Sequence, residues 1–443
     1  MVLILGGGLA GLSAGRALAG AGRPYRILER EDRVGGLCRT VRRDGFAFDL
    51  TGHLLHLRTD RCRRILEPAL RDRFLAVERR SYVYSHGVFT EYPFQANTHG
   101  LPPRVIRDCL LGFLAVHGRA PRPDEPLSFR SWILRTFGTG IAEHFMIPFN
   151  EKIWCADLDA LSAEWVAWSI PQPSLEEVVG GAVGLTNRRL GYNAEFFYPR
   201  AGGIDHLPNF LAEGLRGIEL GARVESVDLD RRRVRLADGT EREYDTLVST
   251  MPLDRFLRIA SGLPGEILAV GRRLRSVRVV NLNLGVERAG IFPGHWIYFP
   301  EPEFPFYRVG FPANFTPRAV PPGCASMYVE FSLPPGAAYR REDLLESARA
   351  GLRRAGILRP DDRIPVVEWA EIDPAYVLHD PFRREHLPQV VRFLAERDVI
   401  CAGRFGAWGY GSMEDAIREG MEAAERILAP AAAEAGARCA ARR

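Results

Sequence analysis

A glycine-rich turn directly after a short apolar strand is the strongest constraint on how this chain can fold. Residues 2–5 read Val-Leu-Ile-Leu, and glycines follow at positions 6, 8 and 11 with G-x-G-x-x-G spacing. In dinucleotide-binding folds, Gly6 would permit the tight turn, Gly8 would let a pyrophosphate approach the backbone, and Gly11 would let the next helix pack on the strand. A helix predicted over residues 12–21 would point its N-terminal amides at the phosphates.

A carboxylate and a second glycine pair extend this pattern. The next predicted strand, residues 25–28, ends at Glu29, where an acid can hold a ribose hydroxyl. Gly35 and Gly36 then form a second turn, which nicotinamide-binding domains do not need. Near the other end, an apolar strand over 398–402 leads to Gly403, and a helix over 412–428 carries an apolar stripe. We therefore expect the cofactor to be FAD, held by both ends of the chain.

The length of the chain, and the change along it from one type of predicted secondary structure to another, predict several domains. A chain of 443 residues is too long for one core. We expect an α/β fold with a discontinuous, Rossmann-like FAD-binding domain over 1–80, 200–265 and 390–430. A helical insertion is predicted over 104–195, and a mainly antiparallel sheet, the substrate domain, over 81–103 and 266–389. A hairpin is predicted around residues 85–87, and the alanine-rich residues 431–443 are predicted to form a frayed tail.

Composition narrows the partners. The formal net charge is only +4, Lys152 is the only lysine, and the arginines form short scattered runs such as Arg79-Arg80, which are typical of solvated faces or turns. The seven cysteines form no C-x-x-C pair, and no apolar run approaches the roughly 20 residues of a membrane span. We therefore expect a cytoplasmic protein with reduced thiols, no metal site, no nucleic-acid partner and no membrane anchor. A homo-oligomer is a candidate state.

Several motifs, in one order along the chain, carry a resemblance to a known family. They are Gly52-His53, Glu91-Tyr92-Pro93-Phe94-Gln95-Ala96-Asn97, Pro148-Phe149-Asn150-Glu151-Lys152-Ile153-Trp154, Trp296-Ile297-Tyr298-Phe299-Pro300-Glu301, Pro305-Phe306-Tyr307-Arg308 and Gly403-Arg404-Phe405-Gly406-Ala407-Trp408-Gly409-Tyr410. With these motifs the chain resembles the UDP-galactopyranose mutase family, and its eukaryotic type in particular, from residue 2 to about 428. The wider group to which it is similar holds FAD-dependent protoporphyrinogen oxidases, phytoene desaturases and amine oxidases.

The resemblance implies an isomerase that uses its flavin in an unusual way. In such mutases the FAD must be reduced, although the reaction has no net redox change. The flavin N5 acts as a covalent nucleophile at the anomeric carbon and displaces the nucleoside diphosphate, after which the sugar closes as a five-membered ring. The implied partner is a small nucleotide sugar, and NADPH is a candidate reductant.

The resemblance also implies roles for matched residues. Catalytic roles fall on His53, near the flavin N5, and on a group that grips the diphosphate, namely Arg308, Tyr298, Tyr376 and Tyr410. Substrate-binding roles fall on Gln95, Asn97, Asn150, Trp154, Ser169, Asn193 and Tyr307. Cofactor contacts are implied for Gly403, Arg404 and Asp415, beside the set Gly6, Gly8, Gly11, Glu29, Gly35 and Gly36.

Two positions depart from the family pattern. Ser169 stands where the family has a second arginine on the diphosphate, and Gly409 stands where a basic residue is expected. Either another arginine takes over, with Arg188 and Arg189 as candidates, or the substrate is not UDP-galactose. Three functions therefore stay open: a sugar-nucleotide mutase, an FAD-dependent oxidoreductase of the amine oxidase or desaturase type acting on a sugar nucleotide or another small molecule, and a non-catalytic flavin-binding protein.

Overall fold

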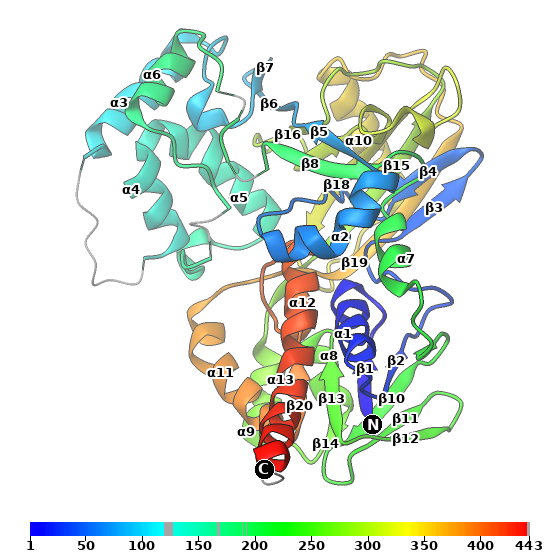
Figure 1. Ribbon diagram of the computed structural model, residues 1–443. Helices are drawn as coiled ribbons and strands as arrows, with labels where there is room; N and C mark the ends of the chain where they lie inside the picture. The colour runs from blue at the N-terminus through cyan, green and yellow to red at the C-terminus, as the bar shows by residue number, and fades with distance from the viewer. Residues whose placement is uncertain (119–126, 166–168, 188, 192, 441–443) are drawn as a thin grey trace.

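The computed structural model describes residues 1–118, 127–165, 169–187, 189–191 and 193–440. Figure 1 shows a lower region that holds both termini and an upper region in which a second sheet lies beside a lobe of helices. The predicted α/β class is confirmed: the lower region is built on a parallel sheet and the sheet of the upper region is mainly antiparallel.

The parallel sheet is the dinucleotide-binding fold that the glycine motif predicts. Its strands lie in the order β20 (Val399–Cys401), β13 (Thr246–Ser249), β1 (Val2–Leu5), β2 (Tyr25–Leu28) and β9 (Ile218–Glu219), all paired in parallel. Helix α1 (Leu9–Gly20) follows β1, and helix α13 (Met413–Ala440) packs on α1 (Figure 1). A Cβ at Gly11 would overlap the carbonyl oxygen of Gly6, so only glycine lets α1 lie this close to β1. Helix α13 extends across most of the segment predicted to be a frayed tail.

A smaller sheet and three helices complete the lower region. The strands are β12 (Glu241–Glu243), β11 (Arg233–Leu236), β10 (Val224–Asp228) and β14 (Ala260–Ser261). The helices are α8 (Leu253–Ile259), α9 (Gly265–Arg273) and α11 (Pro381–Ala395). Apolar residues of β1 and β13 form one buried cluster with residues of α8 and α11, which covers the face of the parallel sheet opposite to the one that α1 and α13 cover.

The upper sheet is assembled from distant segments. Its order is β19 (Val366–Val377), β15 (Ser276–Val286), β18 (Ala325–Leu333), β17 (Arg308–Gly310), β16 (Trp296–Tyr298), β6 (Ser81–Ser85) and β7 (Val88–Glu91). The predicted hairpin is confirmed as β6 and β7, and β6 joins the sheet by parallel pairing with β16. Helix α10 (Arg341–Arg354) packs Ala348 and Leu352 on the apolar side chains of β15 and β18. These strands are rich in β-branched and aromatic residues, which suit a buried sheet.

Shorter elements connect the two regions. They are the strand pairs β3 (Thr40–Arg43) with β4 (Phe46–Asp49) and β5 (Phe74–Glu78) with β8 (Glu195–Pro199), and the helices α2 (Asp60–Arg73), α7 (His206–Ala212) and α12 (Gly403–Gly406). The helical lobe contains α3 (Pro103–Val116), α4 (Phe129–Ile141), α5 (Ile147–Trp154) and α6 (Leu175–Ala182). A π-helical turn, Ala142–Met146, joins α4 directly to α5.

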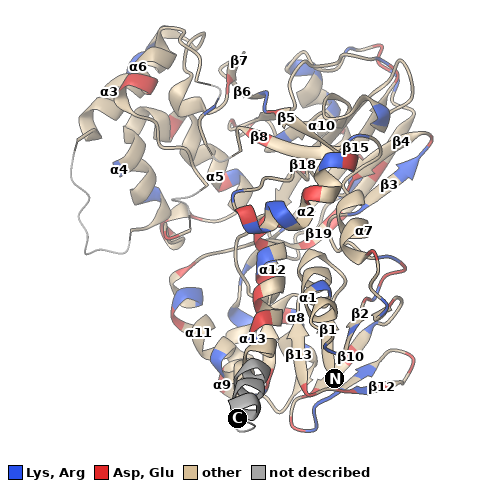
Figure 2. Cartoon of the chain, viewed as in Figure 1, with Lys and Arg blue, Asp and Glu red and all other residues tan. Residues whose placement is uncertain are grey.

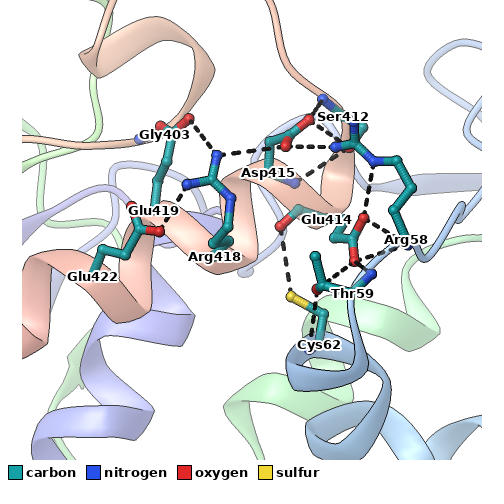
Figure 3. A network of polar contacts seen from close by, with 10 residues as sticks. All are labelled: Arg58, Thr59, Cys62, Gly403, Ser412, Glu414, Asp415, Arg418, Glu419 and Glu422. Carbon is teal, nitrogen blue, oxygen red and sulfur yellow. Dashed lines mark hydrogen bonds and ion pairs between the residues drawn. The ribbon is translucent and has the colours of Figure 1, made fainter. Parts of the chain in front are cut away.

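A polar network ties the start of α13 to the segment before α2 (Figure 3). The buried carboxylate of Glu414 accepts hydrogen bonds from the backbone N–H groups of Arg58 and Thr59 at 2.9 and 2.8 Å, and from the Thr59 hydroxyl at 2.7 Å. The Arg58 guanidinium donates to Asp415 at 2.6 Å. A buried carboxylate that loses its hydrogen-bond donors destabilises the fold, so this network fixes the last helix against the segment that leads into α2.

The described residues carry charges of both signs on their elements, and they lack both a membrane-spanning helix and a metal-binding group. Figure 2 shows acidic and basic residues interleaved over the elements of both regions. Within the part of the chain that is described, the helices lack the combination of length and apolar character that crossing a membrane requires. The described residues also contain no group of three or more His, Cys, Asp or Glu side chains able to hold a metal ion.

Candidate active site

One large cavity, of about 810 Å³, lies where the two regions and the helical lobe meet. It begins at the turn after β1 and extends to side chains of α5 and β16. Most residues with predicted roles line it, namely Gly6, Gly8, Glu29, Gly35, Gly36, His53, Gln95, Asn150, Trp154, Ser169, Asn193, Tyr298, Arg308, Tyr376, Gly403, Arg404 and Tyr410. The structure thus brings together residues that are up to 404 positions apart in the sequence.

The glycine turns form a cradle at one end of the cavity. The N–H of Gly35 donates to the carbonyl of Gly7 at 2.8 Å, and a Cβ at Gly36 would lie 3.2 Å from the Cα of Gly8. The Glu29 carboxylate, which is buried, accepts from the N–H of Gly7 at 2.6 Å. Bare backbone and one carboxylate at the end of β1 and β2 fit the pyrophosphate and ribose of a dinucleotide such as FAD.

His53 lies in a short segment after β4 and lines the cavity. Its Nδ1 donates to the carbonyl oxygen of Thr51 at 3.1 Å, which leaves Nε2 as the acceptor nitrogen. Burial lowers the pKa of the His53 imidazole to about 4, and the positive charges of Arg404 and Arg308 act in the same direction. The ring is therefore neutral at physiological pH.

Arg308 is held by a buried carboxylate on the neighbouring strand. Its Nε and Nη2 donate to Glu330 at 2.6 and 2.8 Å, and the register of β17 and β18 places the two residues directly opposite one another. The Arg308 side chain is 20% exposed and Glu330 is fully buried. Two parallel hydrogen bonds to one carboxylate fix both the position and the plane of the guanidinium.

Aromatic side chains and a second guanidinium form the wall beyond Arg308. The Arg404 guanidinium lies 5.1 and 5.0 Å from the ring centres of Tyr376 and Tyr410, within cation–π range. Its Nε and Nη2 atoms are buried, and they have no hydrogen-bond acceptor among the described residues. The Trp154 ring lies 5.5 Å from Tyr376 and 6.0 Å from Tyr410. A desolvated cation with free donors suits an anionic or carbonyl-bearing ligand.

The amide side chains that line the cavity are oriented by protein groups. The Trp154 indole donates to Asn150 Oδ1 at 3.1 Å, and Asn150 Nδ2 donates to the carbonyl of Met146 in the π-helical turn at 2.7 Å. Gln95 Nε2 donates to the carbonyl of Pro171 at 2.6 Å, and Ser169 lines the cavity close by in the sequence. These bonds hold the amides in fixed orientations before any ligand binds.

Four residues with predicted roles do not line the cavity. Gly11 lies at the α1–β1 contact described above. Asn97 donates to the carbonyl of Pro93 at 3.1 Å and accepts from the N–H of Asn187 at 2.9 Å, so it shapes a loop. The Tyr307 hydroxyl lies 3.4 Å from that of Tyr376 and is buried behind it. The Asp415 carboxylate accepts a hydrogen bond from the N–H of Ser412 and forms an ion pair with Arg58 (Figure 3).

Two arginines, Arg188 and Arg189, are the candidates to replace the basic residues that are absent at positions 169 and 409. Arg189 is exposed and pairs with Glu78 at 3.3 Å, outside the cavity lining, and Arg188 lies outside the described residues. A different arginine is near the second departure. The Nη2 of Arg383, on α11, lies 3.9 Å from the point that a Cβ on Gly409 would occupy. The guanidinium of Arg383 thus takes the space beside position 409.

Three residues at the site were missed by sequence reasoning. Arg79, interpreted from its Arg-Arg pair as a solvated position, is instead 2% exposed; it donates to Asn193 Oδ1 and to the carbonyl of Leu190 at 3.0 Å. Glu330 is the single charge in the apolar run of β18, a signal that could have been noticed. Trp165 lines the cavity, its ring centre 5.2 Å from that of Tyr410, and its indole nitrogen is buried with no acceptor among the described residues.

A dinucleotide cradle on a parallel sheet, with a separate sheet lining the same cavity, defines the chain as a dinucleotide-binding protein. Residues 9–428 match the family of flavin containing amine oxidoreductases, and the chain belongs to this family. The crystal structure of a reduced UDP-galactopyranose mutase is similar to it with a TM-score of 0.91 and 28% identity, over 97% of this chain and 95% of that one. The resemblance to the UDP-galactopyranose mutase family seen in the sequence is thereby confirmed, whereas its eukaryotic type stays a prediction.

More distant relatives share the fold or one segment. A fatty acid isomerase from P. acnes has a TM-score of 0.67 at 15% identity, over 96% of this chain and 98% of that one, which shows the fold alone. A 4,4'-diapolycopene oxygenase of Methylomonas sp is 44% identical over 54 residues, 12% of this chain and 11% of that protein. An L-amino acid oxidase of Crotalus durissus cumanensis is 55% identical over 42 residues, 10% and 8% of the two chains. The chain thus spans about a tenth of the length of the curated relatives it matches.

Proposed function

We propose that this chain is a flavin-dependent mutase that interconverts the pyranose and furanose forms of a nucleotide sugar, with UDP-galactopyranose as the first candidate substrate. The observation that carries the proposal is convergence: Arg308 and the tyrosines Tyr298, Tyr376 and Tyr410 line the same cavity as the two glycine turns. A diphosphate needs a guanidinium and hydroxyl donors, and the dinucleotide needs the bare backbone. The whole-chain likeness to the reduced mutase supports the pairing of these two sites.

The residues of the chain then divide the work. Arg308 and the tyrosine hydroxyls would bind the diphosphate and stabilise the negative charge that develops on it as it leaves. Trp154, Asn150 and Gln95 would orient the sugar and the nucleotide. His53 is neutral, so its Nε2 can accept a hydrogen bond beside the flavin without adding charge. The aromatic wall would keep water from the opened sugar.

The cofactor of the proposal is FAD in its reduced form. Gly8, Gly36 and Glu29 would hold its pyrophosphate and ribose, and Arg404 would contact its ring system. When bound, reduced FAD supplies a nucleophilic ring nitrogen. The proposal includes NADPH as a candidate reductant. It also includes a reducing, cytoplasmic location, which is supported by the six described cysteines that are free thiols.

A second candidate function is an FAD-dependent oxidoreductase of the amine oxidase type. Family membership favours it, and so do Ser169 and Gly409, which replace two basic residues of the mutase pattern. In this case the cavity would accept a donor that carries less negative charge than a nucleoside diphosphate.

One experiment separates the two. The purified protein, loaded with FAD, is incubated with UDP-galactopyranose after dithionite reduction and, in parallel, in its oxidised form under air. A mutase converts the sugar only when reduced and consumes no oxidant, as chromatography of the nucleotide sugars would show. Substrate-dependent bleaching of the oxidised flavin with formation of hydrogen peroxide would instead support the oxidoreductase.

A further inference from the structure

One buried carboxylate, that of Glu330, connects Arg308 to the segment that carries His53. Glu330 Oε1 and Oε2 receive the Nη2 and Nε atoms of Arg308, and Oε1 also accepts from the hydroxyl of Thr51 and from the N–H of Gly52 at 3.3 Å. Glu330 therefore bonds at once to the arginine that faces the substrate and to the segment that carries His53. The contact between Thr51 and His53, from Nδ1 to the carbonyl oxygen at 3.1 Å, completes the chain of bonds.

The bonds to Glu330 decide which edge of Arg308 can reach a ligand. Nε and Nη2 are occupied, whereas Nη1 has no hydrogen-bond partner among the described residues and belongs to a side chain that lines the cavity. A carboxylate that is fully buried is tolerated only while its donors stay in place. Arg308 is thus held ready for a phosphate oxygen without waiting for the ligand to order it, which lowers the entropic cost of binding.

The segment on the other side of Glu330 has little room to move. A Cβ at Gly52 would overlap the Tyr328 hydroxyl, so the backbone at Gly52 packs directly against the Tyr328 side chain of β18. Any shift of His53 that moves Thr51 must therefore change a hydrogen bond to Glu330, and any movement of Arg308 must do the same from the opposite side. Two groups that share one acceptor in this way are energetically coupled, and the coupling is equal in both directions.

We propose that Glu330 is a positioning residue that holds Arg308 for a diphosphate and couples the occupancy of that site to the segment bearing His53 beside the flavin. This inference rests on the proposed function for the identity of the diphosphate site. Its consequence is that a diphosphate ligand and the redox state of the flavin each affect the other through Glu330.

The test uses the FAD-loaded protein with UDP as the probe and inorganic pyrophosphate as a second probe. Three variants are compared with the wild type: Glu330→Gln, which keeps the shape, Thr51→Val, which removes the hydroxyl bond from the His53 segment to Glu330 and leaves the longer bond from the N–H of Gly52, and Glu368→Gln as a matched control. Glu368 makes an ion pair with Arg43 at 2.9 Å on the same sheet but outside the cavity lining. The measurements are FAD content, the dissociation constant of UDP by calorimetry, and the midpoint potential of the flavin with and without UDP.

We expect wild type and Glu368→Gln to bind UDP equally and to show a shift of the flavin potential when UDP is added. Glu330→Gln should keep its FAD, weaken UDP binding at least tenfold, and lose the shift. Thr51→Val should change UDP affinity less than threefold and reduce the shift to less than half of the wild-type value, because only the bond from Gly52 still joins Glu330 to the His53 segment. Wild-type affinity with an intact shift in Glu330→Gln would overturn the proposal, and so would an intact shift in Thr51→Val, the variant that decides the matter if Glu330→Gln does not fold.

These outcomes separate the inference from the proposed function. If the wild type turns over no nucleotide sugar but still binds UDP or pyrophosphate through Glu330 with a shift of the flavin potential, the mutase is wrong and the positioning role stands. A wild type that binds neither probe contradicts both.

Discussion

Arg383 occupies the space beside Gly409: its Nη2 lies 3.9 Å from where a Cβ at position 409 would sit, and its Nε donates to the carbonyl of Trp408 at 2.8 Å. Burial lowers the pKa of this guanidinium, although nearby Asp380 and Glu164 act in the opposite direction. A cation on α11 thus stands next to the glycine that replaces the expected basic residue. The two positions should behave as one unit when they are mutated.

The first prediction concerns that unit. Gly409→Lys would place a second positive charge against Arg383, so we expect it to destabilise the protein by about 1 kcal/mol. In an Arg383→Ala background the same lysine should cost less, because the repulsion is gone and the space is free. Thermal denaturation of the four proteins of this double-mutant cycle measures the coupling. Additive effects would show that Arg383 and position 409 are independent.

Gly11→Val should abolish flavin binding. The new side chain would overlap the carbonyl oxygen of Gly6 and push α1 off β1, with a cost of several kcal/mol. The yellow colour and the FAD content of the purified variant measure this outcome. Gly20→Ala, at the open end of the same helix where a Cβ meets nothing within 4 Å, is the control and should retain FAD. A Gly11→Val protein that stays yellow would contradict the predicted packing.

Arg308→Ala should lower affinity for UDP by about 100-fold, since it removes a charged contact to phosphate. The structure adds a second effect: Glu330 would be left buried without its guanidinium, at a cost of about 3–5 kcal/mol in folding stability. The double variant Arg308→Ala with Glu330→Gln should regain part of that stability but none of the affinity. Calorimetry and thermal denaturation distinguish the two effects. If the single variant keeps its affinity for UDP, Arg308 is structural.

The neutral state of His53 predicts how stability depends on pH. Its folded pKa of about 4 lies below the ordinary value of 6.5, so between these values the unfolded chain binds a proton that the folded chain does not. This group therefore contributes a loss of stability as the pH falls from about 6.5 to 4, on the order of 3 kcal/mol, and nothing above that window. Urea denaturation of wild type and His53→Asn across the window should show a smaller acid loss in the variant. The exposed His117, changed to Asn, is the control; equal slopes for wild type and His53→Asn would refute the idea.

Ser169→Arg tests the first departure. If the ligand is a nucleoside diphosphate and the site is merely weakened, a second guanidinium at the cavity should tighten UDP binding about tenfold. Ser169→Ala separates the loss of serine from the gain of arginine. Should the arginine abolish turnover of the true substrate while UDP binding does not improve, Ser169 marks a pocket shaped for a different molecule.

Local patterns predicted two local features of the fold correctly. The contact that Gly11 makes and the hairpin of β6 and β7 both depend on residues close in sequence, and such signals survive without knowledge of the fold. The role of Glu330 could not be read in this way, because β18 is buried on both faces and its alternation does not say which neighbour a charge will meet. The prediction that Arg79 is solvated was wrong for a related reason. Arg80 beside it is exposed, and only the tertiary packing shows that Arg79 is buried.

The parallel sheet pairs strands from both ends of this sequence, and this pairing decides when during synthesis the flavin site can fold. Strand β1 is made first, but its sheet lacks β20 until residue 401 has been synthesised, and α1 lacks its cover until α13 follows. During translation the glycine cradle therefore waits, partly uncovered, for about 400 residues. Stable flavin capture must then wait until β20 and α13 have formed, so cells short of flavin would accumulate loosely closed chains.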